Sequence, residues 1–157
     1  MSLYGLLIGI GFALAAHYFT LHNHSISDSH KPAFILLVFL FSFIGARLYH
    51  VFDYWAYYSQ YPLQVLNTPA GGLGIYGGII GALIFIFGYT GKTRIPLLSI
   101  TDTIAPVLPL AQSLGRFGNF INHEGFGPPT SLPWGQFISP QHRPPQFASY
   151  STFHPTW

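Results

Sequence analysis

The sequence of 157 residues contains no cysteine and few charged residues. Without cysteine, the chain has no disulfide, no thiolate metal site and no cysteine nucleophile of its own. Only 6% of its residues are charged, compared with about 25% in ordinary soluble domains. Such a chain could not keep its surface in contact with water, so the composition excludes a soluble globular domain.

Basic clusters and metal-ligand sets are also missing. Six Lys and Arg against four Asp and Glu give a net charge of +2, but no five of the basic residues are clustered, so we expect no nucleic-acid partner. The first loop carries His22, His24 and His30, with Asp28 as the one other candidate ligand. This set lacks the fixed geometry of a metal site. We therefore expect no metal and no cofactor.

The chain consists largely of long apolar blocks. A helix that spans a bilayer needs about 20 mostly apolar residues. Four segments meet this requirement: 3–19, 33–52, 71–90 and 95–115. The first lacks the charged start and cleavage site of a signal peptide, so we expect it to be retained. The sequence predicts an all-α membrane protein with four transmembrane helices in a single domain, residues 1–157.

The basic residues predict how these helices are oriented, because Lys and Arg collect in cytoplasmic loops. Lys31 lies in the first loop, and Lys92 and Arg94 lie in the third. The second loop, 53–70, has no Lys or Arg and is rich in aromatic residues. The N-terminus is then outside. Residues 116–157, rich in Pro, Gly and aromatic residues, form an outward-facing C-terminal loop.

Several charged residues lie within or beside these apolar segments. A charge at the centre of a bilayer costs roughly 2.5–3.5 kcal/mol, so Arg47 and Asp102 must face a protein interior or a watery cavity. Arg116, Asn119 and Glu124 gather at the outer end of the fourth segment. One interpretation is structural: ion pairs between helices, or side chains that reach to the interface. The density of polar groups around Arg116 favours a functional site there.

The residues from Gly115 to Gly127 read GRFGNFINHEGFG. This run resembles the signature of the prolipoprotein diacylglyceryl transferases, G-R-x-G-N-F-x-N-x-E-x-x-G, at every fixed position. Further segments resemble the same family in the same order along the chain: Tyr4-Gly5-Leu6, Gly45-Ala46-Arg47-Leu48, the glycine-rich span from Gly71 to Gly81, Asp102 with Pro106, Pro129 to Gly135, and His154-Pro155-Thr156.

The resemblance implies a reaction. Members of the family move a diacylglyceryl group from phosphatidylglycerol to the lipobox cysteine of a prolipoprotein, form a thioether and release glycerol phosphate. It also implies a multi-pass protein of the bacterial plasma (inner) membrane whose active site faces outward. Its partners would be phosphatidylglycerol, other membrane lipid and the lipobox segment.

The residue types of the signature suit this chemistry. Arg116 could hold the anionic phosphate through two parallel, charge-assisted hydrogen bonds. Asn119 and Asn122 could orient headgroup oxygens, and Glu124 could hold Arg116 or accept from glycerol hydroxyls. The resemblance adds Tyr76 to the catalytic candidates. It adds Tyr4, Gly127, Arg47 and Asp102 to the candidates for substrate binding.

The sequence departs from the family at two points. Where the family often has His, this chain has Tyr76, and a tyrosine with a pKa near 10 is a poor base for a thiol at neutral pH. Tyr76 could instead hydrogen-bond the headgroup, and His50 or His123 could substitute as the base. The chain also ends at Trp157, before the three further helices and the further essential Arg of the family. We expect the N-terminal part of a seven-helix transferase.

Two alternatives to a working transferase stay open. The chain could be a truncated, non-catalytic remnant that binds lipid without turnover. It could also be a small transporter or channel subunit in which Arg47 and Asp102 line a path. The second alternative gives no reason for the signature at the outer end of a helix.

The predicted orientation can be tested by cysteine labelling at two loop serines. Because Lys31 lies in the loop of Ser25, a Ser25→Cys variant should be protected from an impermeant thiol reagent in intact cells. A Ser59→Cys variant, in the loop without basic residues, should be labelled. Labelling of the first variant with protection of the second would reverse the predicted orientation.

Overall fold

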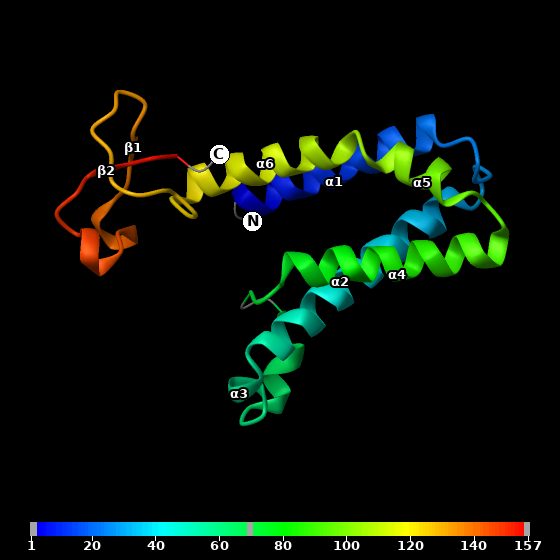
Figure 1. Cartoon of the computed structure of the whole chain (residues 1–157), viewed down its shortest axis with the longest axis horizontal. Helices are drawn as coiled ribbons and strands as arrows, with labels where there is room; N and C mark the ends of the chain where they lie inside the picture. The colour runs from blue at the N-terminus through cyan, green and yellow to red at the C-terminus, as the bar shows by residue number, and fades with distance from the viewer. Residues whose placement is uncertain (1–2, 69–70, 156–157) are drawn as a thin grey trace. The chain divides into compact units, whose positions relative to one another are not determined.

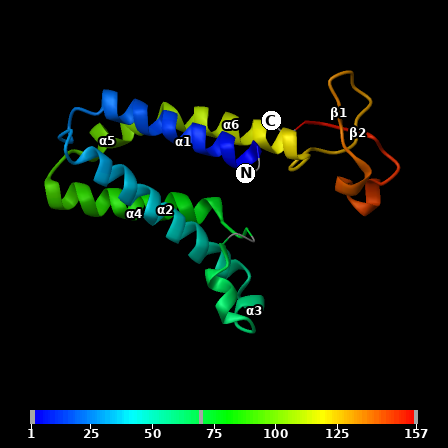
Figure 2. The same ribbon diagram turned by 180° about the vertical axis from the view of Figure 1, so that it is seen from behind.

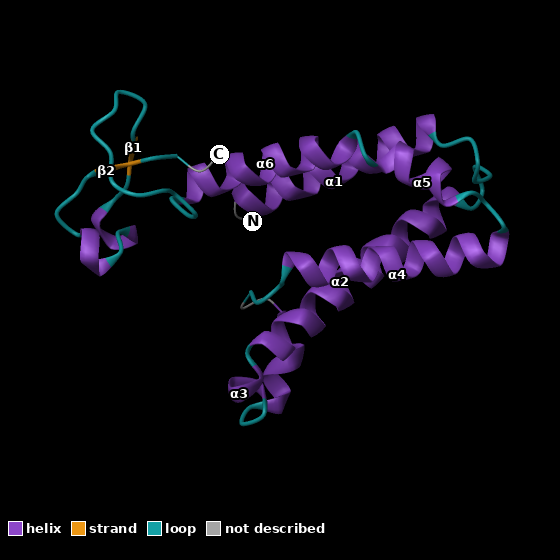
Figure 3. Cartoon of the chain, in the orientation of Figure 1, coloured by secondary structure: helices purple, strands orange, loops and turns teal. Residues whose placement is uncertain are grey.

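The computed structural model describes residues 3–68 and 71–155, with side chains from Gly5 onward. The elements, in chain order, are α1 (Leu3–His22), α2 (Lys31–Asp53), α3 (Trp55–Tyr58), η1 (Pro62–Leu66), α4 (Ile75–Thr93), α5 (Leu97–Ile104), α6 (Val107–Asn122), β1 (Gln136–Phe137), η3 (Pro140–His142), η4 (Pro145–Phe147) and β2 (Thr152–Phe153). Helices dominate the ribbon, as Figure 3 shows by colour.

Four segments of the described chain are long and apolar enough to cross a membrane: Gly5–His22, Lys31–Asp53, Ile75–Thr93 and Leu97–Asn122. This confirms the predicted all-α, multi-pass membrane architecture. The chain divides into two compact units. One comprises Met1–Phe19 and Thr103–Trp157, and the other comprises Thr20–Asp102.

In the second unit, α2 and α4 lie side by side (Figures 1 and 2), and glycines form their contact. A Cβ on Gly45 would overlap the carbonyl oxygen of Gly77 and lie 3.0 Å from Cα of Gly81. A Cβ on Gly81 would overlap the carbonyl oxygen of Phe41. Small residues let helix backbones approach this closely in a membrane. The glycines at 77 and 81 therefore serve helix packing.

Aromatic side chains pack the opposite end of the same helix pair. The ring of Phe34, near the start of α2, lies 5.4 Å from Phe85 and 4.9 Å from Tyr89, near the end of α4. Gly45, later in α2, contacts Gly77, earlier in α4. The two helices therefore run antiparallel, as two consecutive membrane crossings require.

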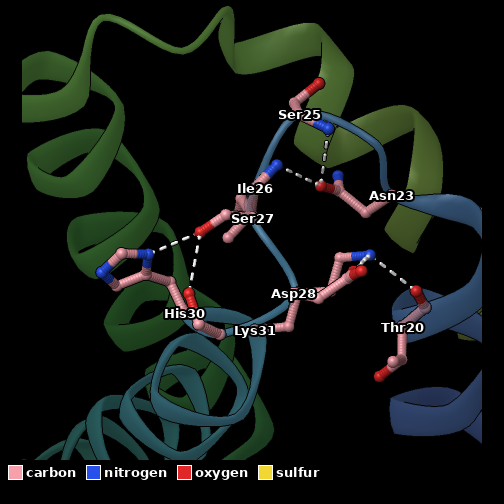
Figure 4. A network of polar contacts seen from close by, with 9 residues as sticks. Thr20, Asn23, Ser25, Ile26, Ser27, Asp28, His30 and Lys31 are labelled. Atoms are coloured by element: carbon pink, nitrogen blue, oxygen red, sulfur yellow. Dashed lines mark hydrogen bonds and ion pairs between the residues drawn. The ribbon is translucent and has the colours of Figure 1, made fainter.

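A buried asparagine organises the loop between α1 and α2 (Figure 4). The side chain of Asn23 is 1% exposed. Its Oδ1 accepts hydrogen bonds from the backbone N–H groups of Ser25 (3.2 Å) and Ile26 (3.0 Å). Its Nδ2 donates to the carbonyl oxygen of Ser99 at 3.2 Å. One side chain thus fixes the start of this loop to the start of α5.

The cation of the same loop is buried. Nζ of Lys31, the first residue of α2, donates to the carbonyl oxygen of Thr20 at 2.8 Å and to Oδ1 of Asp28 at 2.7 Å. This hydrogen bond and the charge of Lys31 lower the pKa of the exposed Asp28 carboxyl. The ammonium group therefore joins the end of α1 to the start of α2.

The fourth spanning segment differs from the expected single helix 95–115. It consists of α5 and α6, separated by a turn at residues 105–106. Pro106 explains the break, because a proline has no N–H to donate and its ring clashes with the carbonyl four residues earlier. At its other end, α6 continues to Asn122. The first eight signature residues are therefore helical.

Residues 116–157 were expected to be loop, but residues 116–122 belong to α6 and residues 123–155 contain a small packed substructure. Strands β1 and β2 pair antiparallel, with Gln136 opposite Phe153. Phe153 and Ile138 are fully buried, and the ring of Phe126 lies 4.9 Å from that of Phe153. The recurring aromatic residues of this region thus form a core of its own.

The glycine contact between α2 and α4 gives a prediction for stability. A Gly77→Ala variant should unfold more easily in detergent, by about 1–3 kcal/mol, because the added methyl group overlaps the Gly45 carbonyl and forces the helices apart. Gly88 provides a matched control on the same helix, since a Cβ there would meet nothing within 4 Å. Gly88→Ala should be neutral or stabilising. Equal thermal stability of the two variants would contradict close packing at Gly77.

Candidate functional site

The signature places three polar side chains along the last two turns of α6. Arg116, Asn119 and Asn122 follow one another at a spacing of three residues, so they form a stripe on neighbouring faces of the helix. Arg116 is exposed, and the two asparagines are half-buried. Within the described residues of their unit, none of the three side chains makes a hydrogen bond or an ion pair. The stripe is free to bind a ligand.

The chain turns sharply directly after this stripe. His123 adopts a left-handed conformation with φ of 55°, and the N–H of Glu124 donates to the carbonyl oxygen of Asn119 at 2.9 Å. This hydrogen bond satisfies one of the carbonyl groups left free at a helix end. The side chain of Glu124 is exposed and, in the described part of the unit, forms no ion pair with Arg116.

His123 is half-buried beside this turn. Its ring lies 5.6 Å from the ring of His142, to which the hydroxyl of Ser139 is hydrogen-bonded at 2.7 Å. Nδ1 of His123 is buried and has no hydrogen-bond partner among the described residues. A buried nitrogen is poorly placed to take a proton from a substrate, so Nδ1 is not the atom through which His123 would act as the base.

Gln136 supports the end of α6, a role that the sequence analysis missed. Its side chain is 8% exposed, and its Nε2 donates to the carbonyl oxygen of Phe120 at 2.7 Å. Phe120 lies between the two asparagines of the stripe. The amide of Gln136 therefore joins β1 to the signature helix. The sequence gives little sign of this contact, because a glutamine in a loop usually faces water.

Gly127, the last fixed residue of the signature, packs against His154, the residue that directly follows β2. Its N–H donates to the carbonyl oxygen of His154 at 2.7 Å, and the N–H of His154 donates to Pro128 at 2.9 Å. A Cβ on Gly127 would lie 2.9 Å from Cβ of His154. Glycine is therefore required here for close backbone pairing, and this structural role accounts for Gly127 without a ligand.

Arg47, in the other unit, uses its whole guanidinium within the protein. The side chain is 6% exposed. In the structure the second loop extends to Gly74, because α4 begins at Ile75. The five N–H groups donate to carbonyl oxygens of this loop: Nε to Val65, Nη1 to Gly71 and Gly72, and Nη2 to Gln64 and Asn67. A guanidinium has five N–H donors. No donor remains for a lipid phosphate, so the geometry favours a structural role for Arg47 over a role in substrate binding.

The glycines at the end of this loop make the arrangement possible. Gly71 and Gly72 have φ of 92° and 81°, a region that residues with a Cβ rarely adopt. A Cβ on Gly72 would also lie 2.6 Å from the ring of His50 and 2.7 Å from Nη1 of Arg47. The chain can pass this close to the two side chains only with glycine.

A small open cavity of about 170 Å³ lies beside Arg47 and His50. It is lined by the side of α2 that carries Arg47 and His50 and by residues of the second loop, Tyr57, Tyr58, Gln64, Asn67, Gly71 and Gly72. The ring of Tyr58 also lies 5.3 Å from the guanidinium carbon of Arg47. The loop thus folds around the arginine.

Tyr76 lies in the first turn of α4 and is 65% exposed. Its ring centroid is 6.0 Å from that of Tyr49 on α2. In the described part of its unit, no hydrogen bond involves its hydroxyl. Like the stripe on α6, Tyr76 presents a free polar group.

For the remaining candidates, Asp102 and Tyr4, the part of the chain that the structure describes shows no contact that assigns a role. Asp102 is exposed near the end of α5 and has no ion-pair partner among the described residues. Tyr4 lies in α1, but its side chain falls outside the described ones. The described residues contain no group of three or more His, Asp or Glu that could hold a metal ion. Arg116, Asn119, Asn122, Glu124 and Gly127 share one unit, whereas Arg47, Tyr76 and Asp102 belong to the other.

The chain matches the family model described as prolipoprotein diacylglyceryl transferase over residues 1–157. The chain is also similar to relatives named phosphatidylglycerol–prolipoprotein diacylglyceryl transferase. The protein of Fervidobacterium nodosum is 47% identical over 73% of this chain and 39% of its own length. That of Thermotoga maritima is 38% identical over 98% of this chain and 54% of its own length. That of Acaryochloris marina is 37% identical over 98% of this chain and 57% of its own length. The chain spans about half the length of these curated relatives.

Proposed function

The chain belongs to the prolipoprotein diacylglyceryl transferase family, and on that premise we propose that it serves transfer of a diacylglyceryl group from phosphatidylglycerol to the lipobox cysteine of a prolipoprotein. One observation carries the proposal. The signature forms a stripe on α6 in which the Arg116 guanidinium, followed by Asn119 and Asn122, has no partner within its unit.

The reaction has one main electrostatic demand. The cysteine sulfur forms a bond to the carbon of the diacylglyceryl group that carries the phosphate oxygen. The bond between this carbon and that oxygen breaks. Glycerol phosphate leaves with the electron pair, and the thiol proton passes to a base. Negative charge therefore remains on the leaving phosphate. Arg116 stabilises that charge through paired N–H groups, and the effect is strong in a site of reduced dielectric.

The neighbouring residues orient the lipid. The amides of Asn119 and Asn122 hydrogen-bond headgroup oxygens, and the exposed Glu124 accepts from glycerol hydroxyls. Tyr76 hydrogen-bonds the headgroup rather than acting as the base. Gly127 and Arg47 contribute through the backbone that they fix. Tyr4 and Asp102 are proposed as further substrate-binding residues.

We place the protein in the bacterial plasma (inner) membrane, with its N-terminus and the Arg116 stripe outside. Support comes from the asymmetry of the loops, since Lys31, Lys92 and Arg94 fall on one side. The opposite side of the membrane is the outer one. There the lipobox cysteine of a secreted prolipoprotein would meet the headgroup of a lipid in the outer leaflet. A transporter offers no comparable account of the signature.

Replacement of Arg116 by lysine tests the phosphate site. An Arg116→Lys variant, introduced into the gene in its host, should lower turnover about 100-fold, because a point charge cannot reproduce two parallel hydrogen bonds. The assay is release of glycerol phosphate and lipidation of a lipobox peptide by isolated membranes. Arg94→Lys, an exposed arginine in the third loop, should leave turnover unchanged. Near-normal activity of Arg116→Lys would assign Arg116 to structure.

Tyr76 yields a second, independent prediction. Tyr76→Phe should reduce turnover up to about tenfold, the value of one neutral hydrogen bond, whereas Tyr76→His should be tolerated because histidine can replace that bond. Tyr49→Phe is the matched control, since its ring is the aromatic neighbour of Tyr76. The same lipidation assay applies. Full activity of Tyr76→Phe, or an equal loss in Tyr49→Phe, would remove the Tyr76 hydroxyl from the site.

A further inference from the structure

The second loop carries two leucines whose apolar side chains are almost fully exposed. Leu63 and Leu66 are 83% and 81% exposed. Both belong to the 3₁₀ helix η1. Residues three apart lie on the same face of a 3₁₀ helix, because it has three residues per turn. The two side chains therefore form one apolar edge.

This edge is held in place from behind. Nη2 and Nε of Arg47 on α2 donate to the backbone carbonyls of Gln64 and Val65 within η1. Arg47 is buried, so these bonds fix the 3₁₀ helix to the end of a spanning helix. The leucines are thus presented outward by a rigid backbone rather than by a loosely attached loop.

The same segment also exposes aromatic side chains. Trp55 and Tyr61 are 60% and 55% exposed. The ring of Trp55 stacks 6.3 Å from that of Phe52, and the ring of Tyr61 lies 5.2 Å from that of Tyr57. Residues 54–66 contain no Lys, Arg, Asp or Glu. Exposed Trp and Tyr without charge are typical of the boundary between a membrane and water.

The spanning helices set the depth of this segment. α2 has 23 residues and ends at Asp53, which gives it a length of about 34 Å. That exceeds the roughly 30 Å of a hydrocarbon core, so residue 54 begins at the boundary. α4 returns from the same boundary at Ile75. Both ends of the segment are therefore tied to the surface of the bilayer.

We propose that residues 54–66 form an interfacial anchor that lies in the headgroup layer of the membrane, with Leu63 and Leu66 inserted at the start of the acyl chains. The occupant of the apolar edge is lipid, because the segment is joined at both ends to spanning helices whose own apolar residues Phe52 (72% exposed) and Ile75 (68%) lie open as well. Since the segment lacks basic residues, the insertion is driven by apolar burial and does not require anionic lipid.

Tryptophan fluorescence tests this depth directly. The full chain carries Leu63→Trp as a single reporter, with Trp55, Trp134 and Trp157 changed to Phe. It is reconstituted into phosphatidylcholine vesicles in which the lipid chains are brominated near the ester. The reporter should lose much of its emission to the brominated lipid and little to aqueous acrylamide. Raising the salt concentration should change neither result.

A matched reporter and a native one complete the experiment. Gln60→Trp, at an exposed polar position of the same segment, should show the reverse pattern. Native Trp55, with the other two tryptophans changed to Phe, keeps both leucines and should also be quenched by brominated lipid. Adding Leu63→Ser and Leu66→Ser to that chain should weaken the quenching and shift the emission to the red. Circular dichroism checks helicity throughout.

Two results would overturn the proposal. Quenching of the Leu63→Trp reporter and of native Trp55 by acrylamide, without quenching by brominated lipid, would place the segment in water. Protection of both from acrylamide and from brominated lipid would show that protein, rather than lipid, covers the apolar edge. Neither outcome would bear on the proposed transferase activity, which rests on Arg116.

Discussion

A buried backbone N–H or C=O group needs a hydrogen-bond partner, and the hydrocarbon core of a lipid bilayer supplies none. Arg47 meets this requirement for the second loop, since its five N–H groups bond to five carbonyl oxygens between residues 64 and 72. Asn23 does the same for the first loop, and Gln136 for the end of α6. In each case one buried polar side chain replaces the water that a soluble loop would use.

The same requirement separates the two arginines that the sequence had placed together as candidates. A guanidinium whose donors are all bonded to carbonyl groups has nothing left to offer a ligand, and Arg47 is in this state. Arg116 is exposed, and within the described part of its unit its guanidinium is unpaired. The donors of Arg116 are therefore available to an anionic ligand, whereas those of Arg47 are not.

The sequence predicted the four spanning segments and the position of the signature because both depend on local pattern: runs of apolar residues and a fixed spacing of polar ones. It did not predict the break between α5 and α6, although Pro106 was visible, since prolines are tolerated in many membrane helices. The partners of Arg47 lie 17 to 25 residues further along the chain. A hydrogen bond between such distant residues depends on the folded loop, as does that of Gln136, and no local pattern encodes it.

The glycines between positions 71 and 81 divide into two groups with different physical tasks. Gly71 and Gly72 let the loop turn against Arg47 and His50, whereas Gly77 and Gly81 let α4 touch the backbone of α2. Tyr76 lies between the two groups. Its backbone is therefore held on one side by the loop that Arg47 fixes and on the other by a close helix contact. The headgroup contact that we propose for Tyr76 needs such a rigid support, and Arg47 and these glycines provide it through the backbone.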